Sequence, residues 1–460
     1  MDTQKYDVIV VGSGQGGGPL SSAFARSGKK TALIEREFAG GTCVNWGCTP
    51  TKTMVASARA TYLARRGKDY GVETGDISMN MKTVRQRKRD IVDSFRSGSQ
   101  SGIDSTDGLT YIHGDARFEG EKSLTVDLVD GGTVQVQAET IVLNVGERSR
   151  PLDIDVPEGV DLLDNRTVME LDEVPDHLVV IGGGPLGLEF AQMFRRFGAK
   201  VTVLNRGDRV LSREDDDIAE GVVEILTEDG IAVINNAEVS AISKHGNEIV
   251  LEYGEMQISA SHVLVAAGRS PNTDDLGVDN AEIELDKRGY ILTNDRLETN
   301  IAGTYAIGDV RPGPKFTHIS YDDFRILKAN LIDGGDRSIK DRLVPATTYI
   351  DPQLGRIGPT ESEIRERGIP YLVASMPMSR VARALETDEP RGLMKVLVHA
   401  ETDQILSGAI LGIEGGEIAS MLQIAMMGHL PYTALRDGVF AHPTLAESLN
   451  NLFASLSEPK

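Results

Sequence analysis

One local pattern occurs twice in this chain of 460 residues: an apolar, β-branched run that leads directly into a glycine loop. The runs cover residues 6–11 and 177–181. In both copies the loop has the spacing Gly-x-Gly-x-x-Gly, first at Gly12, Gly14 and Gly17 and again at Gly182, Gly184 and Gly187. Such glycines permit a tight turn, close approach of a pyrophosphate and close helix packing. The repeat therefore predicts an α/β protein with two Rossmann-like dinucleotide-binding domains.

The end of the next apolar run distinguishes the two ligands. In the first copy this run ends at Glu35, whose carboxylate can accept hydrogen bonds from an adenosine ribose. The corresponding residue of the second copy is Asn205, followed by Arg206 and then Arg209. An amide and guanidinium groups suit a ribose 2′-phosphate, so we expect NADPH at the second loop, with NADH as the alternative. The other interpretation of these arginines is a pair of solvated loop charges.

Cys43 and Cys48 are the only two cysteines, and they lie close together after the first nucleotide unit. Thr49 and Pro50 indicate that a helix begins there, and helix N-termini favour thiolates. We therefore expect a redox-active dithiol with low thiol pKa values. Half of a zinc site would need two further ligands, and no second cysteine pair exists. Two inert buried thiols are the remaining alternative.

Charge and hydropathy limit the partners. The formal net charge of −21 argues against nucleic acid and against an anionic membrane surface. No apolar run approaches the roughly 18 residues that span a bilayer, and no secretory signal is recognisable. Two cysteines in a chain of this size fit a reducing compartment. We expect a cytoplasmic protein, and we predict no metal site.

The rest of the chain shows further strands and turns. Residues 140–146 and 262–268 are apolar runs that end at Gly146 and Gly268, and residues 304–309 end at Asp309. After residue 343 the pattern changes, with strands expected at residues 371–376, 393–399 and 404–411 and a helix at 417–427. Strands without intervening glycine loops indicate an antiparallel sheet in an α+β domain. The basic run within a helix expected at residues 79–96 is interpreted as a solvated face.

These features together resemble the FAD-dependent pyridine nucleotide-disulfide oxidoreductases, the group of glutathione reductase, dihydrolipoyl dehydrogenase and mercuric reductase. The resemblance rests on both glycine loops, the Cys43–Cys48 segment, residues 304–309 and the late segment 442–447, and it covers the whole chain. Within the group the chain looks most like mercuric-reductase-like and reactive-chlorine-resistance flavoproteins. The resemblance implies an FAD-binding domain at 1–150 and 272–342, an NAD(P)-binding domain at 151–271, and a dimerisation domain at 343–460. It also implies a homodimer whose active sites are shared between subunits.

The resemblance also implies roles for single residues. Electrons would pass from NADPH to the flavin and then to a Cys43–Cys48 disulfide, with Cys48 on the flavin side and Cys43 as the exchange thiol. His442 would be the acid–base group for the partner's Cys43, oriented by Glu447. Lys52 would lie near the flavin and pair with Glu189. Further cofactor contacts are expected at Gly41, Thr42, Gly146, Asp309 and Gly268.

The leading hypothesis is thus an enzyme that uses NADPH to reduce a disulfide, an oxidised small molecule or a metal ion. Residues 453–460 lack the cysteine pair with which mercuric reductases capture Hg(II), which argues against mercury reduction. One alternative is a dihydrolipoyl dehydrogenase that oxidises a dithiol with NAD+. A flavin-binding regulatory protein without turnover is the other.

Overall fold

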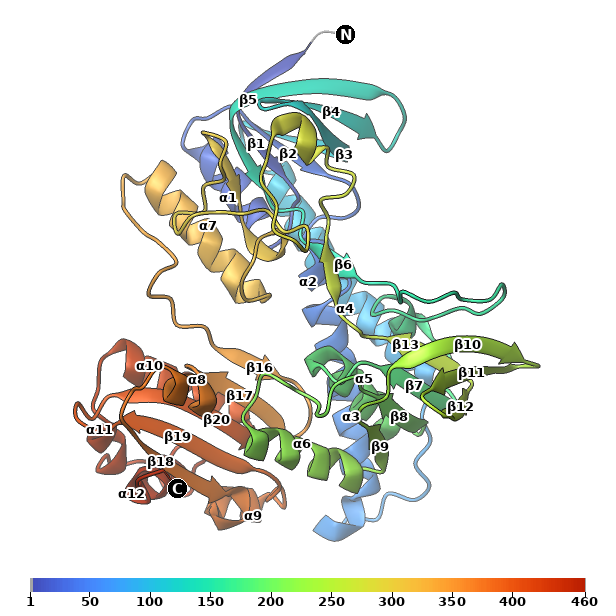
Figure 1. Ribbon diagram of the computed structural model, residues 1–460, viewed down its shortest axis with the longest axis vertical. Coiled ribbons are helices and arrows are strands. Elements are labelled where there is room, and N and C mark those ends of the chain that lie inside the picture. The colour runs from blue at the N-terminus through green and yellow to red at the C-terminus, as the bar shows by residue number, and fades with distance from the viewer. Residues whose placement is uncertain (1–2, 460) are drawn as a thin grey trace. The chain divides into compact units, whose positions relative to one another are not determined.

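The computed structural model describes residues 3–459, which form two compact units (Figure 1). The first unit comprises residues 3–54, 83–150 and 268–342, and the second comprises residues 55–82, 151–267 and 343–459. The helices α3 (Cys48–Arg65) and α4 (Met81–Asp104) contribute residues to both units. None of the helices within the described residues has the length and apolar character needed to cross a bilayer.

The first unit is built on one mixed sheet. Its strands are β1 (Gln4–Val11), β2 (Thr31–Glu35), β3 (Leu109–Gly120), β4 (Ser123–Leu128), β5 (Thr133–Leu143) and β15 (Thr304–Ala306). The pairs β1–β2, β1–β5, β2–β3 and β5–β15 are parallel, whereas β4 pairs antiparallel with β3 and β5. Helices α1 (Gly17–Arg26) and α7 (Thr317–Leu331) pack against each other. Parallel strands with an intervening helix are the expected nucleotide-binding arrangement.

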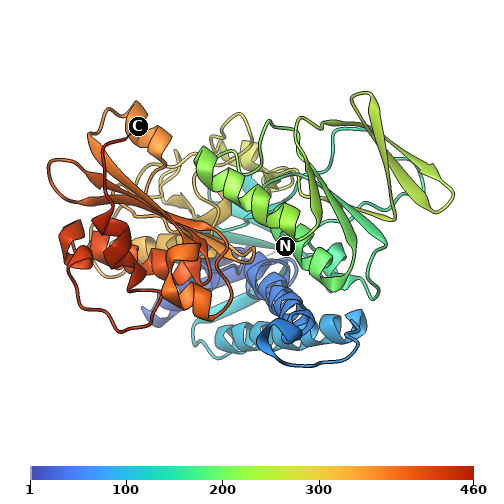
Figure 2. The ribbon, with the colours of Figure 1, turned by 90° about the horizontal axis from the view of Figure 1, so that it is seen from below.

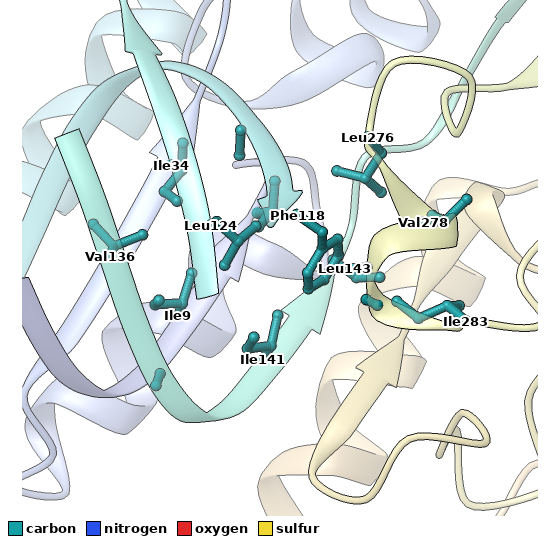
Figure 3. Packing of buried hydrophobic residues seen from close by; sticks show 14 of the residues in the cluster. Ile9, Ile34, Phe118, Leu124, Val136, Ile141, Leu143, Leu276, Val278 and Ile283 are labelled. Carbon is teal, nitrogen blue, oxygen red and sulfur yellow. The ribbon is translucent and has the colours of Figure 1, made fainter. Parts of the chain in front are cut away.

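An apolar core joins distant segments of this unit. Phe118 on β3 is fully buried beside Leu124 and Ile141, and Leu276 and Val278 pack against the same cluster (Figure 3). The Phe118 N–H also donates to the Leu276 carbonyl at 2.9 Å. Residues 268–342 therefore fold with the N-terminal part of the chain.

The second unit contains a smaller parallel sheet of order β13-β7-β8-β9. Its strands and helices are β7 (His177–Ile181), α5 (Pro185–Phe197), β8 (Lys200–Leu204), α6 (Asp216–Glu228), β9 (Ile231–Ile234) and β13 (His262–Val265). A separate antiparallel sheet consists of β10 (Val239–His245), β11 (Glu248–Tyr253) and β12 (Met256–Ala260). The second glycine loop thus lies between a parallel strand and a helix, like the first.

The C-terminal part of the second unit has an antiparallel sheet of order β16-β17-β20-β19-β18. Its strands are β16 (Ala346–Thr348), β17 (Gln353–Ile357), β18 (Tyr371–Pro377), β19 (Leu393–His399) and β20 (Ile405–Gly412). The remaining helices are α8 (Glu361–Glu366), α9 (Ala382–Glu386), α10 (Gly415–Met427), α11 (Tyr432–Arg436) and α12 (Ser448–Ala454). Figure 2 shows this sheet in orange with the red helices beside it.

The antiparallel arrangement and three of its strands were expected, but β16 and β17 were not. A Cβ atom on Gly355 in β17 would lie 2.3 Å from the Gly415 carbonyl oxygen, so this glycine allows α10 to pack directly on the strand. The glycine also weakens the strand signal of a short segment.

The interpretation of the α4 basic run as a solvated face is wrong in part. Lys88 is only 4% exposed, and the Arg87 guanidinium donates to the Thr53 carbonyl at 2.9 Å. A long aliphatic stem lets a lysine such as Lys88 be buried, which a count of charges does not reveal.

Candidate active site

The first glycine loop packs closely against the backbone after β5 and against its own first residue. Gly12 has a φ of +97°, and a Cβ atom there would lie 2.4 Å from the Asn144 carbonyl oxygen. A Cβ atom on Gly17 would lie 2.0 Å from the Gly12 carbonyl oxygen. Because real Cβ atoms do not approach so closely, only glycine permits α1 to begin directly on β1. Because no side chain intervenes, the positive end of the α1 dipole faces an anionic ligand directly.

Two polar side chains hold this loop. Glu35, at the end of β2, accepts hydrogen bonds from the N–H and the hydroxyl of Ser13 at 2.8 and 2.7 Å. Asn144 follows β5, and in the amide orientation that satisfies both groups its oxygen accepts from Gly14 and Gly17 at 3.3 and 3.0 Å. Asn144 was not predicted, because no glycine-loop motif specifies the residue that supports the loop from a neighbouring strand.

The cysteine segment lies directly on the first glycine loop. A Cβ atom on Gly41, the first residue of α2 (Gly41–Asn45), would lie 2.6 Å from the Gly14 Cα atom. Cys43 and Thr42 lie within α2, and Cys48 is the first residue of α3. The helix start expected near Thr49 is thus present, and it places Cys48 where the helix dipole favours negative charge.

The two sulfurs are neighbours. The Cys43 and Cys48 side chains hydrogen-bond to each other, and the Cys48 Sγ atom lies 3.2 Å from the Thr317 hydroxyl. Cys48 is exposed and Cys43 is partly buried. Thr317 is the first residue of α7, so two helix N-termini meet this sulfur pair.

The expectation of a low pKa is wrong for Cys43 in this dithiol form. The hydrogen bond with Cys48, burial and repulsion by an ionised Cys48 raise the pKa of Cys43, whereas Thr317 lowers it. Two sulfurs in contact cannot both ionise easily, because the first thiolate opposes the second and accepts its proton. Low pKa values for both thiols are therefore excluded by their proximity.

The loop between the cysteines is fixed by its own polar contacts. The buried Asn45 amide donates to the carbonyls of Ala39 and Gly41, both at 3.0 Å, and accepts from Arg96 of α4 at 2.6 Å. The Trp46 indole N–H donates to Glu37 at 3.2 Å. This support holds the sulfur pair in a defined position.

Asp309 lies in the short helical turn η4 (Gly308–Val310) that follows β15. Its side chain is partly exposed, and burial raises the pKa of the carboxyl, opposed by Arg269 and Lys315. Gly146 and Gly268 immediately precede β6 (Glu147–Ser149) and β14 (Arg269–Pro271), and both have positive φ values. The antiparallel pair β6–β14 connects these turns.

The second glycine loop repeats the geometry of the first. A Cβ atom on Gly182 would lie 2.4 Å from the Ala266 carbonyl oxygen, and one on Gly187 would lie 2.1 Å from the Gly182 oxygen. At Gly184, in contrast, no protein atom lies within 4 Å of such a Cβ. Pro185 is the first residue of α5, where a missing N–H costs nothing. The space beside Gly184 is therefore available to a ligand.

Asn205 and Arg206 follow β8 on the same side as this loop. The Asn205 amide donates to Asn235 at 2.9 Å and to the Gly207 carbonyl at 3.1 Å. Arg206 is 81% exposed and reaches Glu238 only at 3.8 Å, whereas Arg209 is paired with Asp216. Arg206 is thus the more available cation.

His442 and Glu447 are brought together within the second unit. The His442 Nδ1 atom lies 2.8 Å from a Glu447 carboxylate oxygen, and the His442 side chain is 67% exposed. Glu189, on α5, is buried and accepts the Tyr349 N–H at 2.7 Å. Lys52 belongs to the first unit and Glu189 to the second, and their pairing stays a prediction.

Apolar side chains gather on the outer face of α10 and the segment after it. Ile424 and Met427 are 69% and 64% exposed, and Met421, Leu430 and Val439 are also exposed. Such a face suggests a partner surface. No three potential metal-binding side chains (His, Cys, Asp or Glu) form a cluster anywhere in residues 3–459.

The first unit has the features that FAD requires. Its glycine loop has no side chain at the helix start, the Glu35 carboxylate lies beside that loop, and the Asp309 carboxylate accepts no hydrogen bond from the described residues. The carboxylates can accept hydrogen bonds from hydroxyl groups of a dinucleotide, and the helix start without side chains lets its phosphates approach the positive end of the α1 dipole.

Comparison with known proteins gives matches along nearly the whole chain. The sequence profile described as pyridine nucleotide-disulphide oxidoreductase matches residues 6–323, and the profile of the corresponding dimerisation domain matches residues 344–453. The chain is 36% identical over 456 residues to the probable pyridine nucleotide-disulfide oxidoreductase RclA of Escherichia coli strain K12, covering 98% of this chain and 99% of that protein. It is 30% identical over 449 residues to a mercuric reductase of Streptomyces lividans, covering 96% and 94%.

Solved structures of similar proteins have the same fold as this chain. A Cu(II) complex of the HOCl-induced flavoprotein disulfide reductase RclA from Escherichia coli has a TM-score of 0.91 at 34% identity, with 99% of each chain covered. These likenesses confirm the expected fold class, with nucleotide-binding domains and a C-terminal dimerisation domain.

Proposed function

The chain belongs to the pyridine nucleotide-disulphide oxidoreductase family and is an FAD-dependent oxidoreductase, and from this premise we propose that it reduces its substrate with NADPH through Cys43 and Cys48. The substrate class is a disulfide, an oxidised small molecule or a metal ion. The observation that carries the proposal is the contact between the two sulfurs in the unit that contains the first glycine loop. The matched dimerisation domain indicates a homodimer.

FAD would be held by the first glycine loop, Glu35 and Asp309, and when bound it would supply two-electron chemistry between a nicotinamide and the Cys43–Cys48 pair. The residues of the chain then perform thiol–disulfide exchange. Because the pKa of Cys43 is raised in the dithiol form, His442 accepts the Cys43 proton as this sulfur attacks one sulfur of a disulfide substrate, which forms a mixed disulfide and releases the other sulfur as a thiolate. Cys48 then attacks the Cys43 sulfur, which releases the second thiol and restores the Cys43–Cys48 disulfide. Thr317 stabilises the sulfur pair through its hydrogen bond to Cys48.

His442 supplies the proton that the leaving thiolate requires. Its Nδ1 atom is held by Glu447 at 2.8 Å, so the exposed Nε2 atom is the one that can exchange a proton with substrate. Following the family pattern, we assign His442 to the sulfur pair of the partner subunit. The exposed apolar face of α10 is the dimer surface in this proposal.

NADPH is the proposed electron donor. Asn205 replaces the acidic residue that would repel a 2′-phosphate, and Arg206 is exposed beside it. These residues favour NADPH over the NAD+ of a dihydrolipoyl dehydrogenase, although the chain also resembles such enzymes at about 30% identity. Steady-state rates with NADPH and NADH separate the two assignments.

The acceptor is identified by a panel of candidates with NADPH as donor. Glutathione disulfide, lipoamide, hypothiocyanite and Hg(II) are included as oxidised substrates, and Cu(II) is added because solved relatives are described as Cu(II) complexes. We expect one acceptor to dominate and Cys43→Ser to abolish its reduction while leaving the flavin bound. Unchanged turnover of that acceptor by Cys43→Ser would refute the exchange-thiol assignment.

A further inference from the structure

The turn that contains Asp309 is held from below by a buried carboxylate. Asp323 of α7 is completely buried, and it accepts the Gly308 N–H at 2.9 Å and the Arg311 Nε–H at 3.0 Å. Arg342 donates to the other Asp323 oxygen at 2.8 Å. These contacts fix the two ends of the turn, Gly308 and Arg311. They leave the carbonyls of Asp309 and Arg311 to other donors.

Lys315 provides those donors. Its ammonium group donates to the Asp309 carbonyl at 2.7 Å and also to the Arg311 carbonyl. The same group lies 3.8 Å from the centre of the Tyr290 ring, a cation–π contact that fixes its position. A single side chain therefore joins the Asp309 turn to the loop that carries Tyr290.

The Tyr290 contact extends to a buried ion pair. The Tyr290 hydroxyl donates to Glu147 at 3.0 Å, and Arg269 forms an ion pair with Glu147 at 2.6 Å. Glu147 and Arg269 lie on the paired strands β6 and β14. The cluster thus contains two carboxylates, Glu147 and Asp309, and two cations, Arg269 and Lys315. Arg288 also stacks on the Tyr290 ring, with its guanidinium carbon 5.1 Å from the ring centre. Removal of the lysine charge therefore takes away the cation that contacts the Asp309 turn itself.

We propose that Lys315 is a positioning residue for the flavin, which fixes the Asp309 turn and keeps the Asp309 carboxylate ionised toward a hydroxyl group of the cofactor. The inference rests on the proposed FAD-dependent function and on the expected contact between Asp309 and FAD. Lys315 acts through Asp309 and does not itself take part in electron transfer.

The affinity for FAD should depend on pH through Lys315. Burial lowers the pKa of Lys315 to about 8, opposed by Glu147 and Asp309 and assisted by the nearby Arg311 and Arg288. The Tyr290 pKa is raised to about 12, so Tyr290 stays neutral near pH 8, and burial raises the Asp309 pKa against the opposing charges of Arg269 and Lys315. Lys315 therefore loses its charge as the pH rises through about 8. FAD binding weakens over the same range, because the charged lysine is the form that supports Asp309.

The test compares Lys315→Met, Lys315→Arg and the wild type, with Lys340→Met as a control for loss of an exposed lysine charge. The FAD dissociation constant of each purified holoprotein is measured by flavin fluorescence between about pH 6.5 and pH 9.5. Lys315→Met should raise the constant roughly tenfold or more near pH 7, because two carbonyls lose a charged donor. The wild type should bind more weakly above pH 8, whereas Lys315→Arg, which stays charged, should not.

Wild-type FAD affinity in a folded Lys315→Met protein would overturn the inference. If Lys315→Met does not fold, Lys315→Arg decides, since an affinity that falls above pH 8 as in the wild type also overturns it. These failures are distinct from failure of the proposed function, in which the wild-type protein itself would not bind FAD at any pH.

Discussion

The variant Gly184→Ala should weaken nucleotide binding without changing the stability of the fold. No protein atom lies within 4 Å of the new Cβ, and the backbone angles of Gly184 (φ −81°, ψ 172°) suit alanine. Gly184 is the N-cap of α5, where alanine is disfavoured by roughly 0.5–1 kcal/mol. Restriction of the unfolded chain offsets about 0.4–1 kcal/mol of this cost. The free energy of unfolding should therefore change little.

The added methyl group should strongly weaken binding of the nucleotide. The pyrophosphate approaches the backbone at the second glycine of such a loop. An extra methyl group at a filled contact costs about 1–3 kcal/mol, which corresponds to a rise of about 5- to 150-fold in the KM for NADPH. Steady-state kinetics with an artificial acceptor measure this KM, and thermal unfolding measures the stability. Gly102→Ala on α4, which also meets open space, is the matched control.

The variant Gly187→Ala should differ from Gly184→Ala in its stability. Its Cβ would lie 2.1 Å from the Gly182 carbonyl oxygen, so this variant should lose stability as well as NADPH binding. A Gly184→Ala protein with the wild-type KM for NADPH would refute the assignment of the second glycine loop to the pyridine nucleotide.

Three further predictions concern specificity, assembly and stability. Arg206→Gln should raise the KM for NADPH roughly tenfold and leave the KM for NADH unchanged, whereas equal effects would contradict the 2′-phosphate assignment. Ile424→Glu should yield monomers in sedimentation experiments that bind FAD but do not reduce the acceptor, and an intact dimer would exclude this surface. Asp351→Asn should lower the free energy of unfolding by about 2 kcal/mol near pH 7, because Arg196, 6% exposed, loses the closer of its two carboxylate partners among the described residues and keeps only Asp229 at 3.6 Å. Burial opposes ionisation of Asp351, but Arg196 and Arg59 lower its pKa on balance. The stabilisation is therefore present above the ordinary aspartate pKa and disappears as the pH falls through the lowered value. Urea unfolding curves of the wild type and Asp351→Asn that stay apart at low pH would contradict the mechanism.

The residues that sequence analysis located are those with local signatures. The glycine loops follow from spacing, and Glu35 follows from its place at the end of the next strand. Cys43 and Cys48 lie within one short segment, and the contact between His442 and Glu447 spans only five residues. Each of these features depends on the path of a few consecutive residues.

The residues that sequence analysis missed act across long separations in the chain. Thr317 meets Cys48 across 269 residues, and Tyr290 meets Glu147 across 143 residues. Lys315 lies in a loop without a motif, and its role appears only when the Asp309 turn and the Tyr290 ring are brought together. The Cys43 pKa was wrongly expected to be low because the helix dipole was considered without the neighbouring sulfur.

Anaerobic titration of the purified protein with NADPH tests the central claim most directly. If Cys43 and Cys48 form a disulfide in electronic contact with the flavin, each wild-type chain should take up about four electrons, two for the flavin and two for the sulfur pair. Cys43→Ser should take up about two. Equal uptake by the two proteins would contradict the account.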